Sequence, residues 1–239
     1  MISVCMACYN GEQSIKRQID SILIQLEIDD ELIISDDGST DNTLSIVGSF
    51  RDGRIKVITN NGLKGPVGNF QNALNEASGN FIFLSDQDDI WRPDKVKVMS
   101  ERLNLADLVL SDCRIVDQNL KQIIASFFSF RKSRPGFMHN LYKNSYIGCC
   151  MAFRREILEY VLPFPKHIHM HDWWIGLLVE LKGSVNFIDL PLIDYVRHGN
   201  NVSPTGEIST NPFYKRFLNR VIILWYIVYR NLYISNLVK

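Results

Sequence analysis

A net charge is the first feature that the sequence lacks. Its 26 lysine and arginine residues balance its 26 aspartate and glutamate residues, and this balance argues against a general nucleic-acid binder. The segment Ile2–Met6 is strand-like, and no secretory signal peptide is expected. Hydrophobic residues make up 46% of the 239 positions and charged residues 22%. A chain of this length and composition can bury the core of one large α/β domain or of two small ones.

Cysteine is too scarce and too irregularly spaced for a disulfide framework or a zinc site. The chain has five cysteines, an odd number. Cys5 and Cys8 form a CxxC, but no second CxxC or histidine pair accompanies them, so zinc is not expected. The adjacent Cys149 and Cys150 are expected to be buried packing residues. A reduced cytoplasm is the simplest compartment for such a chain.

Two phosphate-binding motifs and a membrane-spanning run are also missing. No GxGxxG follows the first expected strand, which disfavours a Rossmann dinucleotide site, and neither GxxxxGKS nor GxxxxGKT occurs. The apolar run at residues 221–229 has nine residues, which is too short to span a bilayer.

The first 103 residues alternate between strand-like and helix-like segments. Such an alternation, with short connections, predicts a mostly parallel sheet covered by helices on both faces. The expected fold class is therefore α/β, with a Rossmann-like sheet. Strands are expected at 2–8, 31–35, 54–58 and 81–84, and helices at 12–26, 41–50 and 69–77.

Three carboxylates lie within four residues directly after the fourth expected strand. Alternate side chains of an extended segment point the same way, so Asp86 and Asp88 are expected to face one point and Asp89 another. Two carboxylates at one point suit Mg²⁺ or Mn²⁺, especially where substrate phosphates complete the coordination. The alternative is an N-cap cluster ahead of Arg92-Pro93, because Asp is a good cap and Pro is favoured in a first turn.

Polar segments follow the other three expected strands as well. They are Tyr9-Asn10, Asp36-Asp37 and the glycine-rich stretch 60–68. In parallel sheets ligands bind beyond the carboxyl ends of the strands, so these segments are expected to meet the acidic segment in one site. For Asp36 and Asp37 the alternative is a turn with a cap for the next helix.

The pattern is less regular after residue 103. Residues 118–146 are mixed and partly aromatic and basic, and we interpret them as a mobile or substrate-facing segment. His167, His169 and His171 alternate like metal ligands, but prolines precede them, and a polar loop on the acceptor side is the preferred interpretation. Strands are expected at 106–110, 147–153, 185–188 and 192–196, and helices at 154–162 and 175–181.

Six motifs carry a family resemblance when they are taken in order. They are ACYNGE at 7–12, DDGSTD at 36–41, SDQDDIW at 85–91, NSYIGCCMAF at 144–153, HDWW at 171–174 and YVRHGNNVS at 195–203. The chain resembles the GT-A-fold glycosyltransferases of family 2 over residues 2–205. The resemblance is closest to the bacterial branch that builds O-antigen and capsule repeat units, which includes rhamnosyl-, galactosyl- and glucosyltransferases.

The resemblance implies a domain plan and a reaction. A GT-A domain would span 1–205, with a nucleotide-sugar-binding half at 1–103 and an acceptor-binding half at 104–205, and a C-terminal amphipathic helical tail would span 206–239. The reaction would be an inverting, metal-dependent sugar transfer from UDP-galactose, UDP-glucose or dTDP-rhamnose to a lipid-linked oligosaccharide. Two alternatives stay open: a non-catalytic nucleotide-sugar-binding or scaffold protein of the same fold, and a nucleotidyltransferase. The latter would normally show a basic, glycine-rich loop after the first strand.

On the donor side the resemblance implies particular roles. Asp88 would bind Mn²⁺ or Mg²⁺, and Asp86 would lie nearer the ribose. Asp37 would hydrogen-bond the base with Asp36 close by, and Tyr9 would stack on the base or stand at the rim. The residues expected to bind the nucleotide sugar are Ala7, Tyr9, Asp36, Asp37, Asn69, Asp86 and Gln87.

On the acceptor side the resemblance implies that Asp172 is the catalytic base, which takes the proton of the attacking hydroxyl. The alternative for Asp172 is a helix cap. His198 would reach the metal or the diphosphate, or else be an ordinary loop residue. Asp89 would support the site from behind or cap the next helix. Trp173 and Trp174 would contact the acceptor sugar or fill the core, and the core is expected for one of them.

The tail lacks acidic residues from Ile208 to Lys239 and carries five basic ones. Its aromatic and basic pattern suits a helix lying on an anionic membrane face, which would place the protein in the cytoplasm, peripheral to the inner face of the bacterial plasma membrane. The alternative is a helix packed on the domain or on a second subunit, as in a homodimer. The expected apolar stripe comprises Tyr214, Phe217, Leu218, Val221, Trp225, Val228 and Leu232.

Overall fold

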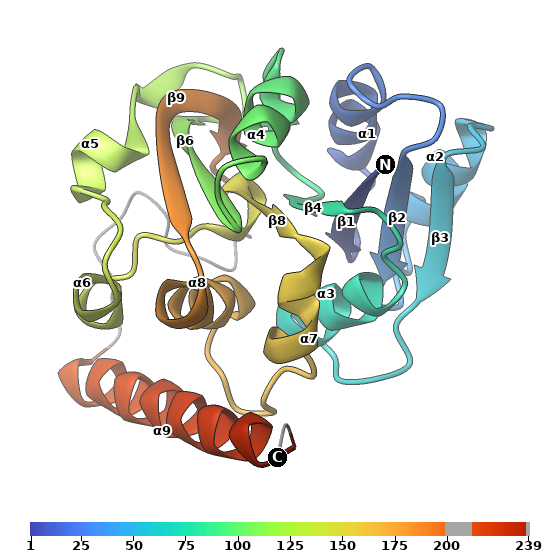
Figure 1. Cartoon of the computed structure of the whole chain (residues 1–239). Coiled ribbons are helices and arrows are strands. Elements are labelled where there is room, and N and C mark those ends of the chain that lie inside the picture. Colours follow the sequence, from blue (N-terminus) through green and yellow to red (C-terminus); the bar gives the residue numbers. More distant parts are fainter. Residues whose placement is uncertain (199–211, 238–239) are drawn as a thin grey trace.

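The computed structural model of the chain describes residues 1–198 and 212–237. Its first half forms the predicted alternation of strands and helices (Figure 1). The elements are β1 (Ile2–Cys8), α1 (Ile15–Leu23), β2 (Glu31–Asp36), α2 (Thr43–Ser49), β3 (Ile55–Thr59), α3 (Pro66–Asn75) and β4 (Phe81–Asp86).

Hydrophobic periodicity explains these elements. Ile15, Ile19 and Ile22 lie on one face of α1, and all three are fully buried, as a stripe of period 3.6 requires. β1 pairs in parallel with β2 and with β4, and β2 pairs in parallel with β3. Strands of a parallel sheet are covered on both faces, and this is why they consist of nearly continuous apolar runs.

The second half of the chain extends the same sheet. β8 runs antiparallel to both β4 and β6 and so joins the two halves. The strand order is β3-β2-β1-β4-β8-β6-β9-β5, with β7 paired to β6. The remaining elements up to residue 196 are β5 (Ile90–Trp91), α4 (Lys95–Leu103), β6 (Leu108–Val116), β7 (Gln122–Ile124), α5 (Phe127–Arg131), α6 (Phe137–Tyr142), η1 (Gly148–Cys150), β8 (Met151–Arg154), η2 (Arg155–Ile157), α7 (Leu158–Val161), α8 (His171–Lys182) and β9 (Val185–Val196).

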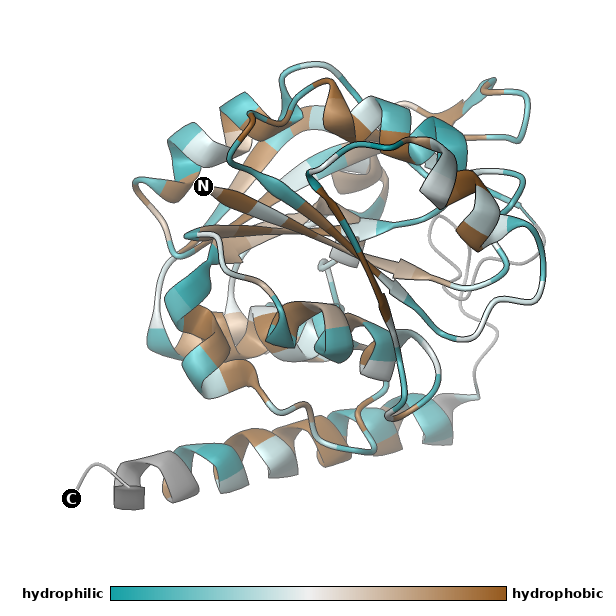
Figure 2. Ribbon diagram, turned by 90° about the vertical axis from the view of Figure 1, so that its right-hand side faces the viewer, coloured by the Kyte–Doolittle hydropathy of each residue, from teal (hydrophilic) through white to brown (hydrophobic). Residues whose placement is uncertain are grey.

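The α/β class is confirmed, and the layers follow from the sheet. Helices cover both of its faces (Figure 1). Figure 2 shows hydrophobic strands enclosed between these helices, with the last helix along the outside of the molecule. The sheet is mixed, because β8 and β5 run against their neighbours.

Two expectations about strands in the second half need correction. The strand expected at 147–153 begins only at Met151, because Gly148–Cys150 form a 3-10 turn. The strands expected at 185–188 and 192–196 are the single strand β9, whose pairing with β6 shifts register at Pro191. The segment 118–146 is built of regular elements, namely β7, α5 and α6.

The tail forms the helix α9 (Phe213–Leu237), which packs on the domain along one narrow face. Ile223 and Ile227 are buried, at 1% and 2% exposure. Nη1 of Arg230 donates to the carbonyls of Tyr160 and Leu162 at 3.1 and 2.7 Å. Packing on the domain is therefore observed for this face, while the expected apolar stripe remains 47–65% exposed. Among the described helices, none combines the length and apolarity that a membrane span requires.

Candidate active site

A cavity of about 1270 Å³ opens at the carboxyl ends of β1 and β4. All four polar segments expected at strand ends contribute to its lining, among them Tyr9, Asp37, Gly65 and Asp86. The second half of the chain and α9 complete the wall. The sequence therefore predicted correctly that these segments meet at one edge of the sheet.

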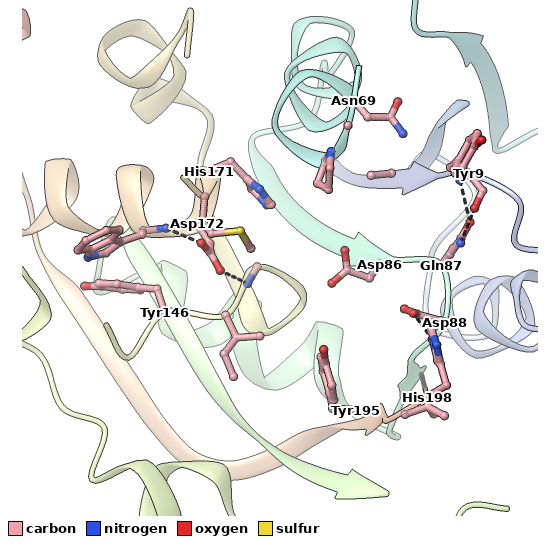
Figure 3. A pocket seen from close by; sticks show the side chains of 18 of the residues that line it. Tyr9, Asn69, Asp86, Gln87, Asp88, Tyr146, His171, Asp172, Tyr195 and His198 are labelled. Carbon is pink, nitrogen blue, oxygen red and sulfur yellow. Dashed lines mark hydrogen bonds and ion pairs between the residues drawn. The ribbon is translucent and has the colours of Figure 1, made fainter. Parts of the chain in front are cut away.

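Asp86 and Asp88 both face the cavity (Figure 3). Oδ2 of Asp88 lies 2.6 Å from Nε2 of His198, so a carboxylate and an imidazole from opposite halves of the chain meet at one point. Arg17 reaches the same loop, where its Nη2 donates to the backbone carbonyl of Asp88 at 3.4 Å. A carboxylate and an imidazole that lie side by side at a cavity could together bind a divalent cation. Phosphate oxygens of a ligand in the cavity would supply the cation's other ligands.

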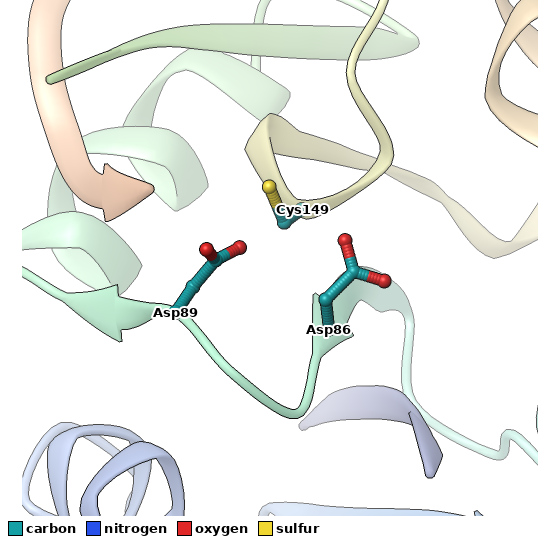
Figure 4. Close-up of side chains that lie close together, drawn as sticks. All are labelled: Asp86, Asp89 and Cys149. Carbon is teal, nitrogen blue, oxygen red and sulfur yellow. The ribbon is translucent and has the colours of Figure 1, made fainter. Parts of the chain in front are cut away.

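Asp89 does not point away from Asp86, contrary to the alternation expected for an extended segment. β4 ends at Asp86, and the side chains of Asp86, Asp89 and Cys149 converge, with ligand atoms within 4.8 Å of one another (Figure 4). Asp89 is fully buried, and its Oδ1 accepts a hydrogen bond from the backbone N–H of Val196 at 3.1 Å. It does not cap α4, whose N-cap is Asp94.

Asp86, Asp89 and Cys149 form a second group that could hold a metal ion, but a thiol ligand does not suit Mg²⁺ or Mn²⁺. Burial, then the charges of Asp88 and Asp86, hold the pKa of Asp89 well above its usual range. A hydrogen bond with Cys150 and burial raise the pKa of Cys149. Both ions prefer ionised oxygen ligands. Because Cys149 offers sulfur rather than oxygen, the pair of Asp88 and His198, which opens to the cavity, is the better fit to these ions.

A buried lysine provides positive charge beneath the carboxylates. Lys95 is fully buried, and its Nζ donates to the carbonyl of Cys149 at 3.1 Å. The same Nζ stands 4.9 Å from the ring centroid of Trp91. A buried ammonium is tolerated only where such partners replace water. Lys95 therefore helps to hold the turn that carries Cys149 against α4.

Asp172 lies in the first turn of α8, where it lines the cavity from the second half of the chain (Figure 3). Its two oxygens accept hydrogen bonds from the backbone N–H groups of Gly148 and Trp173, at 3.0 and 2.6 Å. A Cβ at Gly148 would lie 2.9 Å from Nε2 of His171, so this approach requires glycine. Asp172 is 4% exposed, and burial raises its pKa to about 7. Met170, rather than Asp172, is the N-cap of α8.

Asp86 shares this shift. Burial, followed by the nearby charges of Asp88 and Asp172, raises the pKa of Asp86 to about 8. Perturbed carboxylates that gather in a cavity are typical of a functional site, because such a site brings like charges together for chemistry.

The structure divides the residues expected from the sequence to bind a nucleotide sugar into two groups. Ala7, Tyr9, Asp37, Asn69 and Gln87 line the cavity. Asp36 does not, because its carboxylate accepts hydrogen bonds from the backbone of Gly38 and Ser39, which is the turn alternative.

The cavity-lining residues are themselves fixed by the protein. The amide of Gln87 forms two hydrogen bonds of 2.9 Å with the backbone of Tyr9, whose ring is 54% exposed (Figure 3). Asp37 accepts from Gly65 N–H at 2.7 Å. Nδ2 of Asn69 donates to the carbonyl of Cys8 at 3.0 Å, and its buried Oδ1 has no partner among the described residues.

The histidine and tryptophan expectations are resolved by burial. His171 is buried at 3% exposure and stacks on Phe70 with ring centroids 4.1 Å apart, so it packs at the start of α8 rather than in a loop, while His169 and His171 both line the cavity. Burial lowers the pKa of His171 to about 3. Trp174 is fully buried, and Trp173 is buried while it also lines the cavity.

Sequence reasoning missed several basic residues of the cavity. Arg17, Arg131 and Lys143 line it, as do Arg216 and Arg220 of α9. The basic and aromatic composition of 118–146 indicated a substrate-facing segment. Nothing in the local pattern, however, indicated that α9 would meet this segment.

The family model described as glycosyl transferase family 2 matches residues 3–162, well over half of the chain. The chain belongs to glycosyl transferase family 2. Within this family it is 32% identical over 195 residues to the Escherichia coli UDP-Glc:alpha-D-GlcNAc-diphosphoundecaprenol beta-1,3-glucosyltransferase WfgD, covering 81% of this chain and 75% of WfgD. It is 31% identical over 243 residues to the Shigella flexneri dTDP-rhamnosyl transferase RfbG, covering 92% and 80%.

Solved structures place this glycosyltransferase in the GT-A fold, as expected. TarS of S. aureus in complex with UDP-GlcNAc superposes with a TM-score of 0.70 at 20% identity, covering 93% of this chain and 66% of TarS. The Pyrobaculum calidifontis mannosyltransferase PcManGT in complex with GDP-Man and Mn²⁺ superposes with a TM-score of 0.62 at 20% identity, covering 86% of this chain and 58% of PcManGT.

Proposed function

We propose that the chain transfers one sugar, with inversion, from a nucleotide-sugar donor to a sugar–diphosphate–polyprenol acceptor in bacterial surface polysaccharide synthesis. UDP-glucose and dTDP-rhamnose are the donors that the names of WfgD and RfbG indicate, and UDP-galactose fits the same framework. The observation that carries the proposal is that one cavity holds both the Asp88–His198 pair and the buried carboxylate of Asp172.

In the proposed reaction, the donor diphosphate lies near Asp88 and His198. A bound Mn²⁺ or Mg²⁺ would neutralise the charge that builds on the leaving nucleoside diphosphate. Asp172 takes the proton from the acceptor hydroxyl while the oxygen of that hydroxyl bonds to the anomeric carbon of the donor sugar. The bond from the anomeric carbon to the donor phosphate oxygen breaks at the same time. A base with a pKa near the working pH suits this task. The presence of both Asp88 and the buried Asp172 in one cavity favours an enzyme over a non-catalytic binding protein.

The direct test is transfer by the purified protein. We expect it to move glucose, rhamnose or galactose from one of the three donors to a synthetic sugar-diphosphate lipid when Mn²⁺ or Mg²⁺ is present, and chelation with EDTA should stop the reaction. A thermal-shift panel with UDP, dTDP and the nucleotide sugars would identify the donor, because a ligand that binds the folded state raises the melting temperature. No transfer from any of the three donors would overturn the proposal.

The pH dependence follows from Asp172. Its pKa is raised by burial to about 7, so below pH 7 the carboxyl is protonated and cannot accept the proton of the acceptor. We expect kcat/KM for the acceptor to rise about tenfold per pH unit below 7 and to level off above it. A profile that is flat from pH 5.5 to 8 would contradict this role.

We also propose that the exposed face of α9 lies on an anionic membrane surface. Trp225 and Tyr229 stack at a centroid distance of 5.5 Å and are 59% and 54% exposed. Arg230 is turned toward the domain, so this contact depends more on apolar and aromatic burial than the tail's sequence suggested.

The membrane proposal is tested by substituting both exposed aromatic residues. Trp225→Ser with Tyr229→Ser should lower sedimentation with phosphatidylglycerol-rich liposomes by about tenfold or more, because two large aromatic surfaces are lost. Ile223 and Ile227 would still anchor the helix to the domain. The matched control is Ile24→Ser. Ile24 is an apolar residue directly after α1 that is 85% exposed and does not belong to α9. Equal sedimentation of the double variant and the control would remove the membrane idea.

A further inference from the structure

Four basic side chains line the cavity where α5, α6 and α9 meet. Arg131 ends α5, Lys143 follows α6, and Arg216 and Arg220 stand one turn apart on α9. We call these four residues the basic cluster. None of them belongs to the motifs that carry the family resemblance.

No carboxylate pairs with the basic cluster within residues 1–198 and 212–237. Among the described residues, Arg131, Lys143 and Arg220 donate to backbone carbonyls and to no carboxylate, with distances of 3.3, 2.5 and 3.2 Å. The guanidinium of Arg216 makes no hydrogen bond or ion pair with the described residues. Backbone carbonyls orient these cations, but they do not cancel their charge.

The members of the basic cluster also repel one another. Burial, together with the charges of Arg216 and Arg220, lowers the pKa of Arg131, and burial and Arg216 lower that of Arg220. Like charges held together cost free energy unless an anion compensates them. Guanidinium groups bind phosphate oxygens in a bidentate manner, so a diphosphate supplies both the charge and the geometry that the basic cluster lacks.

The position of the basic cluster identifies which diphosphate it suits. The donor diphosphate is already assigned to the carboxyl end of β4. The basic cluster instead connects the cavity to the exposed face of α9, because Arg216 and Arg220 line the cavity while Phe217 and Val221 are 59% and 47% exposed. The order of catalytic base, cations and apolar helix face is the order of sugar, diphosphate and polyprenyl chain in the acceptor.

We propose that the basic cluster binds the diphosphate of the acceptor, with the acceptor sugar at Asp172 and the polyprenyl chain along the exposed face of α9. This assignment rests on the proposed function, because it uses the acceptor named there. Phospholipid headgroups offer the same phosphate chemistry. They would be attracted by every basic side chain near the surface, including Lys215, which is exposed and does not line the cavity.

The test compares two acceptors that carry the same sugar and the same lipid, one joined through a diphosphate and the other through an uncharged ether. Both are presented in neutral detergent micelles. Arg216→Gln should lower the ratio of kcat/KM for the diphosphate acceptor to kcat/KM for the ether acceptor by about tenfold, the worth of one charge-assisted phosphate contact. The matched control, Lys215→Gln, removes a charge from the next position of α9 and should leave this ratio unchanged.

Three results would overturn the assignment: equal losses on both acceptors, no loss on either, or an equal change of the ratio in Lys215→Gln, which would indicate diffuse attraction to phosphate. Calorimetric titration with the diphosphate acceptor separates this inference from the proposed function. A parent protein that binds this acceptor about tenfold more tightly than Arg216→Gln, but transfers no sugar, would support the basic cluster and overturn the reaction.

Discussion

Replacing Asp172 by asparagine is expected to lower kcat by about a thousandfold, with little change in the donor KM. The amide has the size of the carboxyl but cannot take the proton of the attacking hydroxyl. Asp172 stands away from the Asp88–His198 pair that is assigned to the donor (Figure 3), so donor binding should survive. The measurements are initial transfer rates with both substrates varied, and calorimetric binding of the nucleoside diphosphate.

A matched control for this substitution is Asp189→Asn on β9, which removes an exposed carboxylate of the same half. The control should retain the parental rate. If Asp172→Asn keeps more than about a tenth of the parental kcat, Asp172 is not the base.

The same substitution should change how stability depends on pH. Burial raises the pKa of Asp172 to about 7 from a usual value of 3.8, so the folded state holds this proton more tightly than the unfolded state. The free energy of unfolding contributed by the protonated group is therefore present below pH 3.8 and is lost as pH rises to about 7, by an amount on the order of 4 kcal/mol. Asp172→Asn should gain stability relative to the parent between pH 4 and 8, as measured by urea midpoints. A constant difference would contradict this.

Replacing Asp88 by alanine is expected to lower metal-dependent transfer by about a thousandfold or more with the fold intact. The substitution removes the carboxylate that meets His198 at 2.6 Å and leaves the cavity without its best-placed oxygen ligand. Transfer rates across an Mn²⁺ titration, and the melting shift that UDP gives with and without Mn²⁺, would measure the loss.

The control for Asp88→Ala is Asp20→Ala, which removes an exposed carboxylate of α1 that pairs with Lys16 on the same helix. The control should keep both the rate and the Mn²⁺-dependent melting shift. The proposed metal role of Asp88 fails if the alanine variant is as active as the parent at saturating Mn²⁺.

Local patterns predicted the parts of the fold that local physics decides. The apolar runs before Asp36 and Asp86 are buried strands, and the polar residues after them meet at one edge, because parallel strands carry their carboxyl ends to the same side. The pattern failed where a chain turn replaces a strand. Asp89 shares a side with Asp86 because β4 stops before it, and residues 148–150 form a turn although their composition suits a strand.

The basic residues of the site, which the sequence did not predict, come together through contacts between segments that are distant in the sequence. Arg131 and Arg216 are 85 positions apart in the sequence, and neither segment contains a sign that the other will join it. Their meeting follows from the packing of Ile223 and Ile227 on the domain. Periodicity indicates which face of a helix is apolar, but here it did not distinguish a face that meets protein from one that stays open. α9 has both.

The helix α9 lines the cavity with some of its residues and carries the exposed apolar stripe on others. Deleting it would therefore change catalysis and surface attachment together, so only point substitutions can separate them. In the proposed orientation the packing of α9 on the domain also sets the height of Asp172 above the lipid surface. The enzyme would then select acceptors by length. It would use acceptors whose terminal sugar lies at that height, and the terminal sugar of a longer glycan would lie too far from the membrane to reach Asp172.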